Sequence, residues 1–152
     1  MQARLKNPAV LLPDLMPPFQ ALNAVIEKSG LPPKTAGLAH LRASQINGCA
    51  VCIDMHVRMG KKHGETEERL MTVSAWREAP YFTEAERAAL ALTEAVTRLA
   101  DRPDPVPDDV WNEAAKHFDE KALAGLVTQI ALVNVYNRMN VATRQIAGKQ
   151  SW

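Results

Sequence analysis

The two cysteines of the chain lie three residues apart, in the segment CAVCIDMH that spans residues 49–56. On a helix, residues three and four apart share a face, with Cβ atoms about 5–6 Å apart, so Cys49, Cys52 and His56 would lie together. Such a group could act as a redox pair of thiols, contribute to a metal site or fill a core with small side chains. Which use applies depends on where in the helix the pair lies.

An Asn-Gly step precedes the pair directly and predicts that a helix begins at about Cys49. A disulfide needs Cβ atoms about 3.5–4.5 Å apart, and a pair in a first turn reaches this with smaller adjustments than a pair in mid-helix. The free N–H groups and positive dipole end of a helix N-terminus also stabilise a thiolate. The position therefore favours thiol chemistry.

His56 supplies a base for this chemistry, because it lies one turn beyond Cys52 and can take the thiol proton directly or through water. This favours Cys52 as the attacking thiol and Cys49 as the resolving thiol. Closeness to the helix start would by itself favour Cys49, so the order of the two cysteines depends on His56.

Other uses of the pair agree less well with the sequence. A zinc site usually takes four ligands from two segments, and the chain has no second CxxC, only His40, His63 and His117 in addition to His56. Haem attachment needs a histidine directly after the second cysteine, where this chain has Ile53. A thioredoxin domain needs a strand before its CxxC, where this chain has helical periodicity. Two inert core cysteines stay an open alternative.

Helical periodicity extends over nearly the whole chain and predicts an all-α protein, since no run of alternating apolar and polar residues is long enough for a strand. Thr83 and Glu86 have the spacing of a capping box. The last helix is apolar nearly all round, which predicts burial in the core, contact with another subunit or both. The predicted helices run from about Pro17 to Gly30, from Pro32 to Gln45, from Cys49 to Gly64, from Glu65 to Trp76, from Thr83 to Ala100, from Asp108 onward and over roughly 120–146.

Composition excludes several classes of partner. The 18 Lys and Arg residues nearly balance the 17 Asp and Glu residues, and neither sign forms a block, so we expect no nucleic-acid or membrane partner. The first residues lack the apolar core of a signal peptide, and the most apolar stretch, 122–136, is interrupted by polar residues and too short to cross a bilayer. We therefore expect a soluble protein of the reducing cytoplasm.

Three segments resemble a known family. LRASQINGCAVCIDMH (41–56) resembles the signature of the alkylhydroperoxidase-D-like branch of the carboxymuconolactone decarboxylase superfamily, and FTEAERAALALTEAVTRL (82–99) and NVYNRMNVATR (134–144) resemble its downstream segments. The central motif is specific, because CxxCxxxH is joined to SQING on a helical background. The resemblance implies one domain, residues 1–152 with a core at about 15–146, made of stacked helical hairpins that assemble into homo-oligomers, as trimers or hexamers.

The same resemblance implies an antioxidant oxidoreductase of the peroxiredoxin type, a peroxidase or disulfide reductase that uses no metal, flavin or haem. Cys52 would attack a hydroperoxide, Cys49 would close the disulfide, and His56 would relay protons. An external dithiol, a lipoyl carrier or a thioredoxin-like protein, would reopen the pair. Two alternatives stay open: a decarboxylase-type lyase, which needs acid–base residues and no dithiol, and a redox-sensing oligomer without rapid turnover.

One position departs from the family pattern. Family members often carry a glutamate twelve residues before the first cysteine, and this chain has Gly37 there. Glycine cannot hold a proton, so we predict that His40, one turn further along the same helix face, takes over this part of the relay. Ser44 and Gln45 are candidates for contact with substrate, and Asn47 is predicted to cap the helix of the cysteines.

Overall fold

The structure, a computed structural model, describes residues 2–101 and 103–149 and forms helices and loops without a strand in these ranges. The predicted all-α class is confirmed. Residues 1, 102 and 150–152 of the predicted domain lie outside the described part, and its core bounds stay a prediction. The helices are α1 (Pro8–Leu11), α2 (Met16–Glu27), α3 (Pro33–Ile46), α4 (Ala50–Lys62), α5 (Glu67–Thr72), α6 (Glu84–Thr97), α7 (Asp108–His117) and α8 (Glu120–Ala142), with 3-10 turns at Pro13–Leu15, Val73–Ala75 and Leu99–Asp101.

Most helix ends follow the local signals of the sequence. The predicted capping box is present at α6: the Thr83 hydroxyl accepts from the Glu86 N–H, and the Glu86 carboxylate accepts from the Thr83 N–H. Other bounds differ from prediction: α5 ends at Thr72 rather than near Trp76, and α6 ends at Thr97 rather than near Ala100, each with a 3-10 turn soon after it. The short α1 precedes the first predicted helix, and α8 ends at Ala142 rather than near 146, because Arg144 adopts a positive φ of 53°.

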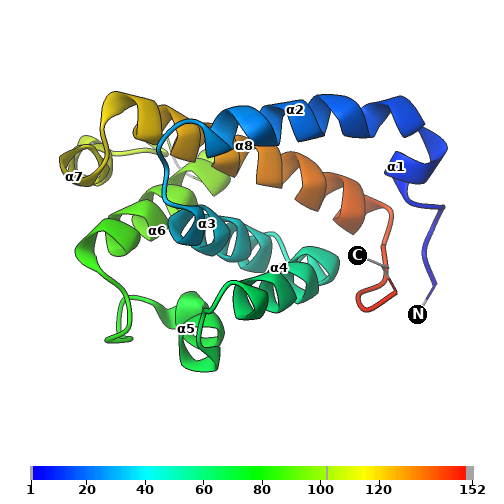
Figure 1. The fold of residues 1–152 in the computed structure, drawn as a ribbon, viewed down its shortest axis with the longest axis horizontal. Helices are drawn as coiled ribbons and strands as arrows, with labels where there is room; N and C mark the ends of the chain where they lie inside the picture. The colour runs from blue at the N-terminus through cyan, green and yellow to red at the C-terminus, as the bar shows by residue number, and fades with distance from the viewer. Residues whose placement is uncertain (1, 102, 150–152) are drawn as a thin grey trace.

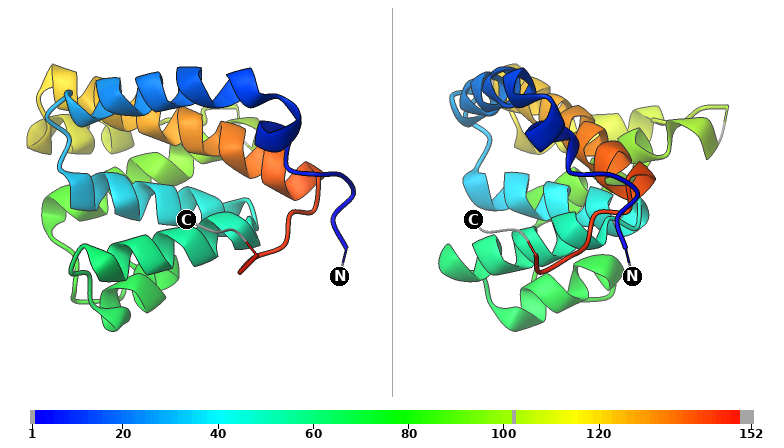
Figure 2. Two further views of the ribbon diagram at one scale, coloured as in Figure 1. Left: turned by 45° about the vertical axis from the view of Figure 1, so that its right-hand side comes forward. Right: turned by 90° about the vertical axis from the view of Figure 1, so that its right-hand side faces the viewer.

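Helix α3 lies at the centre of the fold and packs against α4, α6 and α8 (Figure 1). Helix α2 runs beside α8 along one side of the molecule, whereas α4 and α5 lie on the opposite side of α3 (Figures 1 and 2). Helix α7 packs mainly against α6. Segments far apart in sequence therefore meet at α3, which carries His40 and ends just before the cysteine pair.

Two apolar clusters form the core on either side of α3. One joins α2, α3, α6, α7 and α8 and includes the fully buried Leu126 and Ile130, so the predicted burial of the last helix is confirmed. The other joins α3, α5 and α6 and includes Leu41, Leu70 and Leu90. On the outer side of α8, Val135 keeps 40% of its surface exposed, and contact of α8 with another subunit stays a prediction. None of the described helices combines the length and hydropathy of a membrane span.

Candidate active site around the cysteine pair

The cysteine pair lies at the start of α4. Cys49 is the N-cap residue of the helix, Cys52 lies in its first turn, and the two are joined in a disulfide with their Cα atoms 5.4 Å apart. Gly48, at a φ of +67°, turns the chain from α3 into α4, a conformation that glycine adopts without strain. The helix therefore begins at the pair, as the Asn-Gly step predicts.

Hydrogen bonds hold the first turn in place. The N–H of Cys49 donates to the carbonyl of Ser44 at 2.9 Å, and the N–H of Cys52 donates to Sγ of Cys49 at 3.4 Å. Cys49 and Cys52 are each only 1% exposed and pack with Val51. The sulfur atoms thus lie inside the subunit at a helix N-terminus.

The predicted base, His56, follows on the same helix, but its ring meets another imidazole. The rings of His56 and His40 stack with centroids 3.3 Å apart and planes 24° apart. No hydrogen bond joins His56 to either sulfur among the described residues. Burial lowers the pKa of His56 to about 4, so its imidazole is neutral at pH 7.

His40 joins α3 to α8 inside the protein. It is 4% exposed, its Nδ1 lies 3.4 Å from Nε2 of Gln129, and its Nε2 has no hydrogen-bond partner. Burial, and then the neighbouring His56, lower the pKa of His40 well below its ordinary value. The structure therefore brings His40 to His56, as a relay would need, and keeps both rings neutral.

Gly37 lies on α3 three residues before His40. A Cβ atom added at Gly37 would meet no heavy atom within 4 Å, so the helix leaves room for a side chain where many family members carry glutamate. The absence of a carboxylate here is a property of the sequence and is not imposed by packing.

The predicted role of Asn47 as a cap of α4 is wrong, because Cys49 caps that helix with its own side chain. Asn47 instead ends α3, and its Nδ2 donates to Oδ1 of Asn134 and Oδ1 of Asn137, each at 2.9 Å. Asn137 in turn donates to the Ser44 hydroxyl at 3.0 Å. The side chain of Asn47 therefore ties the turn before the cysteines to α8.

The two candidates for substrate contact lie in different surroundings. Ser44 is fully buried and bonded to Asn137, whereas the half-buried Gln45 accepts from Arg42 at 3.5 Å and lines a cavity of about 260 Å³ beside α4 and α5. Contact of either residue with substrate stays a prediction.

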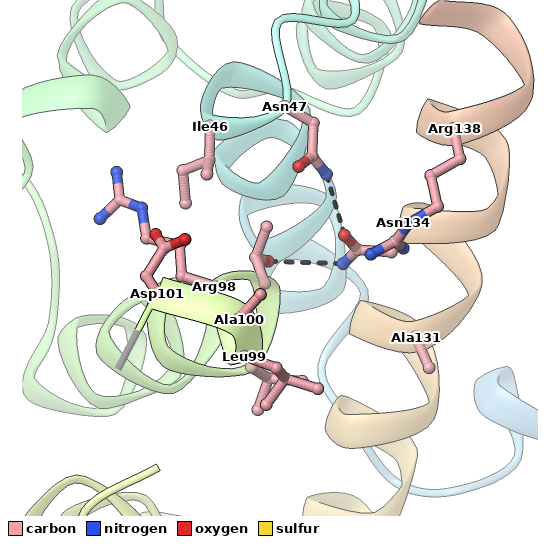
Figure 3. A pocket seen from close by; sticks show the side chains of 11 residues that line it. Ile46, Asn47, Arg98, Leu99, Ala100, Asp101, Ala131, Asn134 and Arg138 are labelled. Carbon is pink, nitrogen blue, oxygen red and sulfur yellow. Dashed lines mark hydrogen bonds between the residues drawn. The ribbon is translucent and has the colours of Figure 1, made fainter. Parts of the chain in front are cut away.

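A larger cavity, of about 540 Å³, opens between the end of α6, the turn Leu99–Asp101 and α8 (Figure 3). Asn47 and Asn134 form part of its wall, with the hydrogen bond between them drawn in the figure. Neither cysteine lines this cavity or the smaller one. Among the described residues, no three His, Cys, Asp or Glu side chains gather as a metal ion would need.

One residue at the pair was not predicted from the sequence. Asn140 of α8 points its amide at the pair, with Nδ2 3.5 Å from Sγ of Cys52. The sequence contains a pattern that indicates this residue: Asn134, Asn137 and Asn140 recur every three residues and so share one face of a mostly apolar helix. That face of α8 meets the end of α3 and the start of α4.

Two curated proteins are similar to this chain in sequence, and a solved structure is similar to it in sequence and fold. The chain is 35% identical to the uncharacterized protein YdfG of Bacillus subtilis (strain 168) over 132 residues, which are 87% of this chain and 88% of YdfG. It is 32% identical to the uncharacterized protein YnjA of Escherichia coli (strain K12), over 76% of this chain and 62% of YnjA. A crystal structure of ATU0492 from Agrobacterium tumefaciens, a protein of unknown function and candidate antioxidant defence protein AhpD, superposes with a TM-score of 0.89 at 35% identity, over 98% of this chain and 100% of that one.

The family model described as carboxymuconolactone decarboxylase family matches residues 13–95, which include His40, the cysteine pair and His56. The match covers more than half of the chain and agrees with the AhpD-like arrangement of its helices. The chain therefore belongs to the carboxymuconolactone decarboxylase family, as an AhpD-like member with a CxxC pair.

Proposed function

We propose that the protein is a cofactor-free thiol peroxidase and disulfide reductase that reduces organic hydroperoxides with Cys49 and Cys52. The observation that carries this proposal is the closed Cys49–Cys52 disulfide in the first turn of α4, with Cys49 accepting the Cys52 N–H. A pair at a helix N-terminus opens and closes with little movement of the backbone and favours the thiolate form.

In the proposed reaction, the Cys52 thiolate attacks the terminal oxygen of the hydroperoxide. A sulfur–oxygen bond forms, the O–O bond breaks, and the alkoxide leaves with a proton as the alcohol. The Cys49 thiol then attacks the Cys52 sulfenic acid, releasing water and closing the disulfide. An external dithiol reopens the pair by thiol–disulfide exchange.

His56 takes the Cys52 proton and returns it to the leaving alkoxide. A neutral imidazole is needed for the first step, and the lowered pKa of His56 keeps the ring neutral. A thiolate formed nearby raises this pKa again, since a negative charge favours the protonated ring. His40, stacked on His56, is the proposed continuation of the relay in place of a glutamate at position 37.

We expect the protein to work as a homo-oligomer, a trimer or hexamer, in the reducing cytoplasm. The dithiol donor would be a lipoyl group on a carrier or a thioredoxin-like protein. Because Cys49 and Cys52 are almost fully buried, the donor must reach the pair through local opening of the first turn of α4.

The test is the consumption of cumene hydroperoxide with dihydrolipoamide as reductant, by the wild type and by Cys49→Ser and Cys52→Ser. We expect turnover by the wild type only, and a Cys52 sulfenic acid, trapped with a 1,3-diketone, in Cys49→Ser. Trapping at Cys49 instead would reverse the order of the two cysteines. A single equivalent of peroxide consumed without turnover would support a redox sensor, and decarboxylation of a carboxymuconolactone that survives Cys52→Ser would support a lyase.

A further inference from the structure

The side chain of Asn140 approaches Cys52 from a different helix. Its Nδ2 is 3.5 Å from Sγ of Cys52, a distance usual for an N–H···S hydrogen bond, and the two residues are 88 positions apart in the chain. We infer that Asn140 is a catalytic residue, the donor that stabilises the thiolate and the sulfenate of Cys52. The catalytic role of Asn140 rests on the proposed function, whereas its effect on the Cys52 pKa does not.

The two sulfurs have different donors. Sγ of Cys49 accepts the backbone N–H of Cys52, which any residue except proline would supply at position 52. Sγ of Cys52 accepts a side-chain amide, which depends on the identity of Asn140. A substitution of Asn140 therefore alters the surroundings of one sulfur and leaves the donor of the other in place.

The amide of Asn140 is available for this contact because Asn134 and Asn137 make the hydrogen bonds that hold α8 against its neighbouring helices. Asn134 bonds to Asn47, Thr97 and the carbonyl of Ile130, and Asn137 bonds to Asn47 and Ser44. The bonds to Asn47 and Ser44 fix α8 against the end of α3, and the bond to Thr97 joins α8 to α6. The side-chain amide of Asn140 has Cys52 as its hydrogen-bond partner among the described residues.

The turn after α8 holds Asn140 in position through its backbone. The carbonyl of Asn140 accepts the N–H of Gln145 at 3.0 Å and the hydroxyl of Thr143 at 3.5 Å. The amide is therefore presented from a helix end whose backbone is itself held in place.

Charge on the sulfur makes this contact stronger. A neutral thiol or disulfide sulfur is a weak acceptor, whereas a thiolate is a full negative charge, and hydrogen bonds to charged groups are about twice as strong as neutral ones. His56 on α4 and His40 on α3 are buried and neutral at pH 7, and the residue of α8 that contacts Cys52 is the uncharged Asn140. Asn140 thus favours loss of the Cys52 proton without adding a charge.

The same N–H group then serves the product of the first step. When the Cys52 thiolate has taken an oxygen from the peroxide, the N–H can donate to that sulfenate oxygen. Once the sulfenate is protonated, the thiol of Cys49, which lies in the same turn, attacks the sulfur of this sulfenic acid, water leaves and the disulfide forms. The role of Asn140 is therefore specific to Cys52 and agrees with Cys52 as the attacking thiol.

The experiment measures each thiol by itself. The pKa of Cys52 is read in Cys49→Ser, and that of Cys49 in Cys52→Ser, from the pH dependence of iodoacetamide alkylation, with and without Asn140→Ala. We expect Asn140→Ala to raise the Cys52 pKa by about one to two units, from the usual strength of a hydrogen bond to a charged group, and to leave the Cys49 pKa within about 0.3 units. Asn140→Asp should raise the Cys52 pKa further, because it places a carboxylate beside the thiolate.

Equal shifts of both thiols would show that Asn140 only holds the fold together and would overturn the inference. An unchanged or lowered Cys52 pKa in Asn140→Ala would also overturn it. These outcomes need no peroxidase turnover, so they are distinct from failure of the proposed function, in which the wild type consumes no hydroperoxide catalytically. Where turnover exists, Asn140→Ala should slow sulfenic acid formation about tenfold or more at pH 7, with recovery at higher pH.

Discussion

The imidazoles of His40 and His56 stack face to face, with ring centroids 3.3 Å apart, and connect α3 to α4 beside the cysteine pair. Two protonated rings could not share this place, because burial and mutual repulsion both oppose charge there. The stack therefore requires neutral histidines. The loss of unfolding free energy when these histidines are protonated can be measured.

Protonation of this stack should make stability depend on pH. His56 has a pKa of about 4 in the folded protein, against about 6.5 in an unfolded chain, and the pKa of His40 is lowered as well. Between these values the unfolded state binds more protons, so the free energy of unfolding falls as the pH drops from 7 toward 4. We expect His56 alone to account for a loss of about 2 kcal/mol between pH 7 and 5.

Urea unfolding at pH 7, 6 and 5 checks this dependence. Glu86 and Glu94, whose pKa values are lowered, lose their contribution below about pH 4.5 and so interfere little in this range. His56→Gln, which cannot take up the proton, should show a smaller loss. Identical pH dependence in the wild type and the variant would contradict the prediction.

The relay can be tested at the position where the carboxylate is missing. Since a Cβ at Gly37 meets no neighbouring atom, Gly37→Glu should fold and raise the peroxidase rate about tenfold or more, by adding a group that accepts protons. Gly37→Gln, of the same size, is the control and should have no such effect. His40→Gln should lower the rate by a similar factor. A large gain in Gly37→Glu with no change in His40→Gln would mean that His40 does not replace the glutamate.

Glu94 should be important for stability, because three side chains donate to its buried carboxylate: Trp76 at 2.9 Å, Arg77 at 2.8 Å and Arg42 at 2.8 Å. Burial acts to raise the pKa of Glu94, but these hydrogen bonds lower it on balance. Glu94→Gln removes the negative charge that pairs with the nearly buried Arg42 and should cost about 2–4 kcal/mol of unfolding free energy.

The matched control for Glu94 is Glu67→Gln, which breaks the exposed ion pair with Lys61. The unfolding midpoint of this control should equal that of the wild type, because exposed pairs contribute little. Equal midpoints for both variants in chemical denaturation would refute the special role of Glu94.

Two helical glycines should respond in opposite ways to the same substitution. A Cβ at Gly125 of α8 would overlap the side chain of Ser29, where the end of α2 passes close, so Gly125→Ala should destabilise by about 1–3 kcal/mol. Gly37→Ala meets open space in α3 and should be neutral or stabilise by up to about 1 kcal/mol, because alanine is the better helix former. Thermal unfolding of the two variants decides, and a destabilising Gly37→Ala would show that the space there is already filled.

Local signals made much of the fold and the centre of the site predictable. The Asn-Gly step set the start of α4 at the cysteines, and the capping box of Thr83 and Glu86 set the start of α6. Each of these features depends on residues within one helical turn, where backbone geometry leaves few alternatives. The spacing of Cys49, Cys52 and His56 on one face follows from the same local geometry.

The tertiary structure decided which side chains meet the pair. The contact of Asn140 with Cys52, the stack of His40 on His56 and the bonds of Asn47 to α8 all join residues of different helices. Helical periodicity indicates which residues share a face of one helix. It does not indicate which face of α8 meets α4, or at which height along its axis α3 packs against these two helices. The position of Asn47 before the helix predicted a cap, but its side chain lies in the contact between α3 and α8. There its amide donates to the side-chain oxygens of Asn134 and Asn137.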